Sequence, residues 1–196
     1  MNTVAEQALI TGVHIFRVYD TSSPEAEAIE QRIEACVAQY KLCKSEAERA
    51  IHRLQYQSLL KPLERFIKRE KVVKNLITTA GRSVLMQRLA NTTTYTGIIN
   101  YGVLGSSATA VANGDTQLGT EVFRKVVASS SYSTNNAFID FFFAKADTNG
   151  TYQEFGTTID GTASANTGQL FTHALTGGWT KSASESMTVA CQYTLS

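Results

Sequence analysis

The spacing of hydrophobic and polar positions changes twice along the chain. Residues 12–19 alternate loosely and are rich in β-branched and aromatic side chains, which predicts a strand. After Pro24 the apolar positions recur at helical spacing, and from Asn91 onward the period becomes two. We therefore expect an α+β protein in which an N-terminal strand and helical arm precede an antiparallel β-sandwich of jelly-roll-like kind. Its predicted parts are a docking arm at residues 1–24, a helical region at residues 25–90 and the sandwich at residues 91–196.

The helical region begins at a clear start signal. Ser23 is a good N-cap, and Pro24 suits the first helical position. The helical stripe that follows is formed by Ile29, Ile33, Cys36, Tyr40, Cys43, Ala47, Ala50 and Leu54. Pro62 is expected to break or kink this helix, and further helices are predicted at residues 63–74 and 79–89. Because the stripe is poor in leucine, a self-sufficient coiled coil is not expected, and residues 1–60 should be stabilised by another subunit.

The second half of the chain predicts six strands separated by polar turns. They are expected at residues 97–104, 121–131, 137–145, 152–159, 169–175 and 186–195. The pair Asn149-Gly150 predicts a hairpin between two of them, and Gly177-Gly178 predicts a loop. About 100 residues can enclose a sandwich core, so residues 91–196 are expected to fold without residues 1–60.

The first strand raises the question of its partner. Its backbone groups need hydrogen bonds, which either the later sheet or a neighbouring subunit must supply. Together with the helical stripe, it predicts a homo-oligomer or a stable complex. The candidate partner interface consists of Val13, Ile15, Phe16, Tyr19, Ile29, Ile33 and Tyr40.

Charge is distributed unevenly, although the net charge is only +1. Residues 25–90 hold 13 of the 18 Lys and Arg, whereas residues 91–196 hold 4. Acidic residues are interleaved with the basic ones around residues 64–74, so we interpret this stretch as a solvated face or a contact with an acidic protein. Nucleic-acid binding is not expected, because a net charge of +1 creates no strong positive field. A membrane span is not expected either, because no apolar run approaches the roughly 20 residues that a span requires. No signal peptide is expected, which indicates synthesis in a cytoplasm.

The three cysteines do not suggest a disulfide framework. Cys36 and Cys43 are seven residues apart on one helix, too far to bond each other. Whether they are buried small side chains or form interchain disulfides stays open. Cys191 alternates with apolar neighbours in the last strand and is expected to be buried.

No catalytic constellation is visible in the sequence. His14, His52 and His173 lie in three separate segments, and no P-loop, nucleophile elbow or zinc-ligand spacing is present. The carboxylates of the second half fit turns better than a glycosidase pair. We therefore expect no enzymatic activity, no catalytic residue, no cofactor and no metal.

Five short motifs carry a family resemblance. They are KNLITTAGR at residues 74–82, GDTQLGTEVFRK at 114–125, YQEFG at 152–156, LFTHAL at 170–175 and KSASESMTV at 181–189. In this order they resemble a β-sandwich module of tailed-phage and prophage structural proteins, of the tail fibre, baseplate or minor structural kind. The resemblance covers about residues 74–196.

The resemblance implies a structural component of a virion, made in the host cytoplasm, whose partners are copies of itself and other virion proteins. A tail-side adaptor, such as a collar, baseplate or fibre-attachment subunit, is the first hypothesis. A capsid decoration protein is the second. A glycan-binding receptor module that uses Trp179, Tyr132 or Tyr152 as stacking platforms is the third. Position in the particle, stoichiometry and host receptor are left open.

One charged pair is expected to fix the register of the sheet. Glu154 stands in a strand beside Phe155 and Gly156, and it could pair with Arg124 across the sheet. Opposite charges that face each other across strands stabilise one register over another. The candidate sandwich register pair is therefore Arg124 and Glu154.

Overall fold

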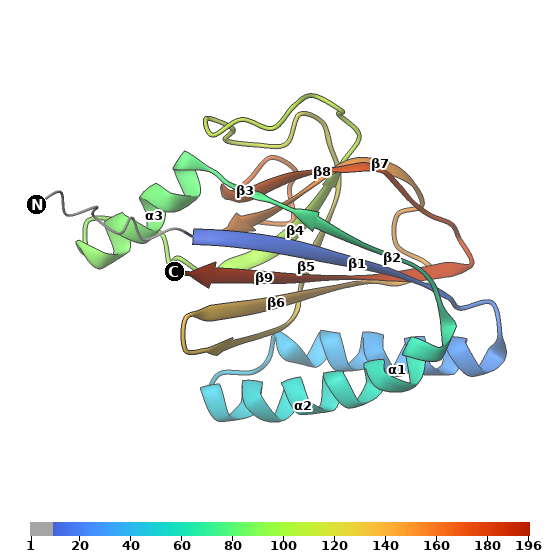
Figure 1. The fold of residues 1–196 in the computed structure, drawn as a ribbon. Helices are drawn as coiled ribbons and strands as arrows, with labels where there is room; N and C mark the ends of the chain where they lie inside the picture. The colour runs from blue at the N-terminus through green and yellow to red at the C-terminus, as the bar shows by residue number, and fades with distance from the viewer. Residues whose placement is uncertain (1–9) are drawn as a thin grey trace, which may run out of the picture.

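The strands of the computed structural model, which describes residues 10–196, form one antiparallel sheet that curls into a nearly closed barrel (Figure 1). The sheet has nine strands in the order β2-β1-β9-β6-β5-β4-β7-β8-β3. The elements are β1 (Ile10–Asp20), α1 (Pro24–Tyr40), α2 (Glu46–Leu63), a 3-10 turn (Glu64–Phe66), β2 (Ile67–Lys74), β3 (Leu76–Ile77), α3 (Thr79–Leu89), β4 (Ile99–Gly105), β5 (Glu121–Ser133), β6 (Asn136–Phe143), β7 (Gly150–Ile159), β8 (Gln169–Lys181) and β9 (Glu185–Leu195).

The α+β class is confirmed, and so are all six strands expected after residue 91. Each predicted strand corresponds to one of β4 to β9, with ends that differ by a few residues. They differ from a two-sheet sandwich because β5 pairs with β6 on one side and with β4 on the other, so that one sheet runs through both halves. A register shift at Val127–Ser129 lies where β5 passes from one half to the other.

Strand β1 is an interior strand of this sheet. It pairs with β9 along its whole length, from Ile10 opposite Leu195 to Asp20 opposite Glu185, and with β2 on its other side. The later sheet therefore supplies the partner that the sequence left open. The boundaries expected at residues 24 and 90 do not separate independent cores, since β1, β2 and the strands after residue 91 build one barrel. A chain limited to residues 91–196 would lack the β1 partner of β9, and its independent folding stays a prediction.

The barrel closes where the chain crosses from β2 to β3. Strand β2 pairs with β1, whereas β3 pairs with β8 at the other edge of the sheet, and only Asn75 separates the two strands. Along the rest of this seam side chains bridge β2 to β8. The ammonium group of Lys71 donates to the Thr176 carbonyl at 2.6 Å, and the guanidinium of Arg69 donates to the Thr180 carbonyl at 2.9 Å. The seam thus satisfies main-chain acceptors of β8 without a backbone ladder.

A buried carboxylate anchors the far end of the seam. Glu185, whose side chain is 3 % exposed, accepts from Lys68 at 3.0 Å and from Arg69 at 3.1 Å. Burial alone would raise the pKa of Glu185. Hydrogen bonds from Ser182, Lys68 and Arg69 outweigh that effect and lower this pKa to about 2. The basic residues of β2 therefore hold the seam together as ion-pair donors.

The barrel interior is filled by side chains from nearly every strand. Phe16 of β1 is fully buried, and its ring meets the ring of Phe155 edge-on at 5.5 Å between centroids. Phe141 contacts the same Phe155 ring at 6.0 Å. Cys191 is buried in this core as expected, and burial raises the pKa of its thiol. A closed barrel of this size leaves space only for packed side chains at its centre.

Helices α1 and α2 lie side by side on one outer side of the barrel (Figure 1). Their apolar side chains pack with Tyr19, Ala128 and Phe142 in a second core outside the barrel. The single long helix expected from the stripe is divided at residues 41–45. Ser45 and Glu48 form a capping box at the N-terminus of α2. This cap favours a new helix start at residue 46 over a continuous helix.

The prediction of a helix at residues 63–74 is wrong. Glu64–Phe66 form a 3-10 turn, and Ile67–Lys74 form strand β2. Nearly all of β2 is exposed, so the apolar spacing in this stretch does not reflect burial on one helical face. Val72 and Val73 favour a strand, and pairing with β1 fixes it. The helix expected at residues 79–89 is confirmed as α3, with Thr78 as its N-cap.

Two turn predictions are also wrong. Asn149-Gly150 does not join adjacent strands, since β6 and β7 are not neighbours in the sheet. Gly177 and Gly178 lie within β8, where both adopt positive φ values of 67° and 82° beside a register shift in the β7–β8 pairing. Glycine there permits a bulge that bends the long strand.

Phe16 provides a direct check on the role of β1. Phe16→Ala is expected to lower the free energy of unfolding by about 3–5 kcal/mol, because it leaves a cavity in the barrel core. The matched control Val72→Ala, at an exposed position of β2, should change it by less than about 1 kcal/mol. Urea denaturation measures both. Equal, small effects would mean that Phe16 contributes only to contacts between molecules.

His14 makes stability depend on pH. It is fully buried in the barrel, and this burial lowers its pKa to about 3, compared with 6.5 when exposed. Since the unfolded chain binds the proton more readily, the contribution of His14 to stability is present above pH 6.5 and is lost as pH falls toward 3.

Replacing His14 by a neutral acceptor should therefore flatten the acid side of the stability profile. Between pH 7 and pH 5 the natural chain should lose about 2 kcal/mol more unfolding free energy than His14→Gln does. Denaturant titrations at the two pH values measure this difference. Parallel profiles for the two chains would show that His14 is not held neutral by the fold.

Candidate interaction surface

One end of the barrel carries three adjoining cavities and several exposed apolar side chains. The start of β1, the end of β9, helix α3 and the connection between β5 and β6 gather there, on the left of Figure 1. The α1–α2 connection lies toward the same end (Figure 1). We call this region the end face, and three adjoining cavities define it.

The first cavity, the mouth cavity, opens into the barrel and has a volume of about 450 Å³. Its walls include Ile139 and Phe171 of the core, and Leu85 of α3 borders it. Three large apolar side chains at its rim face solvent. They are Ile98, Tyr132 and Leu195, which are 60 %, 77 % and 51 % exposed. These three side chains form an exposed apolar cluster around one cavity.

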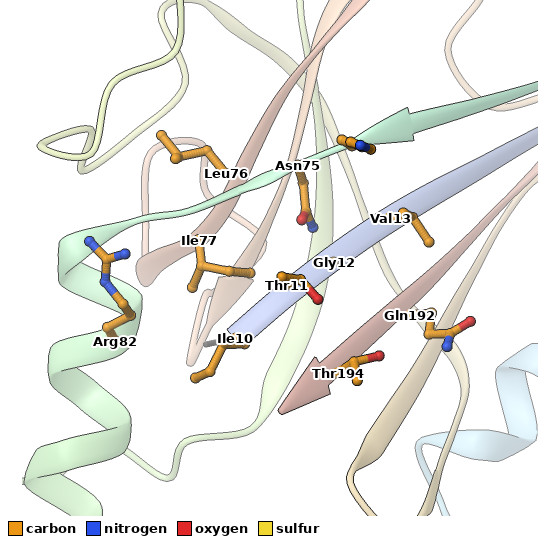
Figure 2. Close-up of a pocket in the computed structure, with 11 residues that line it drawn as sticks. Ile10, Thr11, Gly12, Val13, Asn75, Leu76, Ile77, Arg82, Gln192 and Thr194 are labelled. Carbon is orange, nitrogen blue, oxygen red and sulfur yellow. The ribbon is translucent and has the colours of Figure 1, made fainter. Parts of the chain in front are cut away.

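The second cavity lies between the start of β1 and the β3–α3 connection (Figure 2) and has a volume of about 520 Å³. Lys74 and Arg82 line it together with Asn75. The Asn75 side chain lies over Gly12, where a Cβ atom would come within 2.5 Å of the Asn75 Oδ1 atom. Its Nδ2 atom donates to Nε2 of His14 at 2.8 Å. Gly12 is therefore required so that Asn75 can reach from the seam into the barrel.

The third cavity lies between the α1–α2 connection and strands β4 and β5, with a volume of about 560 Å³. Tyr40, Lys41 and Arg49 line its helical side. It shares Ile98, Ile99 and Ser130 with the mouth cavity, which in turn shares Ile10 and Thr194 with the second cavity. The mouth cavity therefore stands between the other two.

The electrostatics of the end face are one-sided. Lys41, Arg49, Lys74 and Arg82 line the two outer cavities, and no Asp or Glu lines any of the three. Among the described residues none of these four side chains forms an ion pair within 4.0 Å. Arg82 donates only to neutral oxygens of Thr79 and Asn113. The end face thus has an apolar centre between two cationic cavities.

A second cluster, formed by Asp115, Glu154 and His173, resembles an acid–base site in composition. Glu154 is fully buried and accepts from the main-chain N–H groups of residues 107, 119 and 120 at 2.8–3.1 Å. The Nε2 atom of His173 lies 2.8 Å from Glu154, and its Nδ1 atom lies 2.7 Å from Asp115. The imidazole of His173 thus links the two carboxyl groups through its two ring nitrogens.

We call this cluster the clamp, because its hydrogen bonds attach the loop between β4 and β5 to strands β7 and β8. None of the cavities described above includes Glu154 or His173, and every Glu154 contact reaches the loop between β4 and β5 or His173. These buried hydrogen bonds hold that loop against β7 and β8. The expected register pair is wrong, because Glu154 pairs with His173 whereas Arg124 makes two bonds to Glu121, at 2.6 and 2.7 Å. Arg124 and Glu121 are only three residues apart, a local pair that the cross-strand argument overlooked.

The predicted interface residues do not form one surface. Phe16 lies in the barrel core, and Tyr19, Ile29 and Ile33 lie in the second core beneath α1 and α2. Val13 and Ile15 are half-buried on β1. Only two of the seven reach the end face, Val13 in the second cavity and Tyr40 in the third.

The aromatic residues proposed as glycan platforms are mostly internal. Trp179 and Tyr152 are buried in the barrel core, and only Tyr132 is exposed. Cys36 is buried beside His52, while Cys43 is partly exposed, so the interchain question concerns Cys43. In residues 10–196 no helix is long and apolar enough to span a membrane. The same residues contain no group of three or more His, Cys, Asp or Glu placed to hold a metal ion.

Comparisons of the chain with protein-family models, with curated proteins and with solved structures give no match. The end face was also missed by sequence reasoning. Ile98 and Leu195 stand at apolar positions of predicted strands, so their pattern indicates core, and Tyr132 was considered only as a glycan platform. The signal that was present is the excess of basic over acidic residues between residues 41 and 82.

Glu154→Ala is expected to lower the free energy of unfolding by about 3–5 kcal/mol, because it leaves three main-chain N–H groups and a ring nitrogen of buried His173 without their partner. Asp115→Asn, at the partly exposed end of the same network, should cost less. Denaturation together with protease cleavage in residues 106–120 measures both effects. A Glu154→Ala protein as stable and as resistant as the natural chain would rule out the clamp.

Proposed function

We propose that the chain is a non-enzymatic structural component of a phage virion, most directly a tail-side adaptor such as a collar, baseplate or fibre-attachment subunit. The observation that carries the proposal is the end face, where Ile98, Tyr132 and Leu195 remain exposed around an open cavity. Exposed apolar groups of this size favour a protein that is completed by contact with other chains. The ordered motifs between residues 74 and 189 supply the phage character of the proposal.

The architecture supports an adaptor role in a second way. A nearly closed barrel with long paired strands gives a rigid body, and helices α1 and α2 cover one side of it. In this proposal one end of a single body, rather than a separate arm at residues 1–24, makes the docking contact. The jelly-roll-like character of the sheet stays part of the proposal.

A capsid decoration protein is the second candidate, because an apolar end could equally seat the barrel on a head lattice. The glycan-binding alternative has less support, since two of its three proposed stacking residues are buried. Copies of the chain and other virion proteins are the proposed partners, and the virion is the proposed location.

Quantitative mass spectrometry of purified particles tests the proposal. A tail-side adaptor is expected in multiples of three or six per particle, and a decoration protein in hundreds. Ile98→Lys, which places a charge on the end face without disturbing the core, should reduce incorporation several-fold. Lys61→Glu, on the exposed side of α2, is the control and should be incorporated normally. Absence of the chain from particles would contradict the virion proposal.

A further inference from the structure

The order of the three cavities limits what can bind the end face. The mouth cavity is apolar and lies between the cavity of Lys74 and Arg82 (Figure 2) and the cavity of Lys41 and Arg49. Shared lining residues join the three cavities in a row. A molecule that fills all three cavities would contact apolar side chains at its middle and basic side chains at both ends. Three adjoining hollows of about 450–560 Å³ suit a narrow, chain-like occupant better than a flat surface.

The four cations lack a carboxylate partner within the described chain, and Arg82 donates only to neutral oxygens. In the described chain they form no ion pair, whereas Lys68, Arg69 and Arg124 each pair with a carboxylate. Glu48 lies near Arg49, but its side chain accepts from the main-chain N–H groups of Lys44 and Ser45. Charge complementarity therefore calls for acidic groups on the occupant, at both ends of its apolar portion.

We propose that the end face binds an extended segment of another protein in which apolar side chains are flanked on both sides by aspartate or glutamate. The apolar side chains occupy the mouth cavity against Ile98 and Tyr132. The flanking carboxylates contact Lys74 and Arg82 at one end and Lys41 and Arg49 at the other. This mode combines groove burial with charge pairing at the rim, as in other recognition of short segments.

A single-stranded nucleic acid fits the row less well. It requires cations along its whole backbone and aromatic platforms between them. Here the centre of the row is apolar, and Tyr132 is its one strongly exposed aromatic group within the described residues. The proposed segment matches both parts of the surface.

Fluorescence anisotropy with the full chain and a labelled peptide, EEGLFILGEE, tests the inference. Binding is expected to weaken at least about tenfold when glutamine replaces the four glutamates, and on raising the salt concentration. The double variants Lys74→Glu/Arg82→Glu and Lys41→Glu/Arg49→Glu should each weaken it about tenfold. Arg32→Glu/Lys61→Glu, on exposed helical positions away from the cavities, is the matched control and should bind as the natural chain does.

The apolar contribution is tested separately by Ile98→Ser, which should also weaken binding while circular dichroism stays unchanged. Absence of peptide binding at millimolar concentration would overturn the proposal, and so would equal binding by the charge-reversed variants. Tighter binding of oligothymidine than of the peptide would assign the surface to nucleic acid. A stable dimer that Ile98→Lys converts to monomer, with no peptide binding, would assign it to a second copy. The inference does not depend on a virion role, because peptide binding can succeed for a chain that particles lack.

Discussion

The insertion of β1 between β2 and β9 is the constraint on which the rest of the structure depends. Eleven residues near the start of the described chain pair with eleven near its end, and β2 then covers the other edge of β1. The next residues cross at Asn75 to β8, so both edges of the sheet are held by one short stretch of chain. Phe16, Val18 and His14 enter the core through this insertion. A strand that closes a barrel removes the exposed edges that would otherwise invite aggregation.

The same closure explains why one end stays open. The pairing of β2 with β1 ends where Lys74 lies opposite Val13, because the chain then crosses at Asn75 toward β8. The first residues of β1, from Ile10, therefore have no β2 residue opposite them. Helix α3 follows immediately and borders the mouth, with Leu85 toward the cavity. The gap between the seam and α3 becomes the cavity of Lys74 and Arg82 (Figure 2). The end face is thus a consequence of how the barrel closes.

Much of the local structure could be predicted from sequence because it is encoded locally. Period-two alternation located β4 to β9, and Ser23 with Pro24 located the start of α1. The burial of Cys191 followed from its neighbours. These signals depend on residues a few positions apart, which a single sequence contains.

The remaining features depend on residues far apart in the chain. The charged stretch at residues 67–74 is compatible with a solvated helix as well as with a strand. Backbone pairing with β1 selects the strand. Asn149-Gly150 has the composition of a hairpin turn. The two strands beside it, β6 and β7, do not pair, because β6 already pairs with β5 and β9. Ile98 and Leu195 look like core positions because the pattern records apolarity and cannot record an open barrel end. His173 was recognised only as an isolated residue, since its partners lie 58 and 19 positions away.

Native-state hydrogen exchange of the β1 amides tests the central claim most directly. If β1 is an interior strand of the barrel, amides that β1 donates to β9 and β2 exchange as slowly as those of β6 and β9, through global unfolding. If β1 is an arm that docks on another subunit, its amides in the isolated chain exchange many orders of magnitude faster, while β6 and β9 stay protected. That second result would contradict the account of the barrel and of its open end.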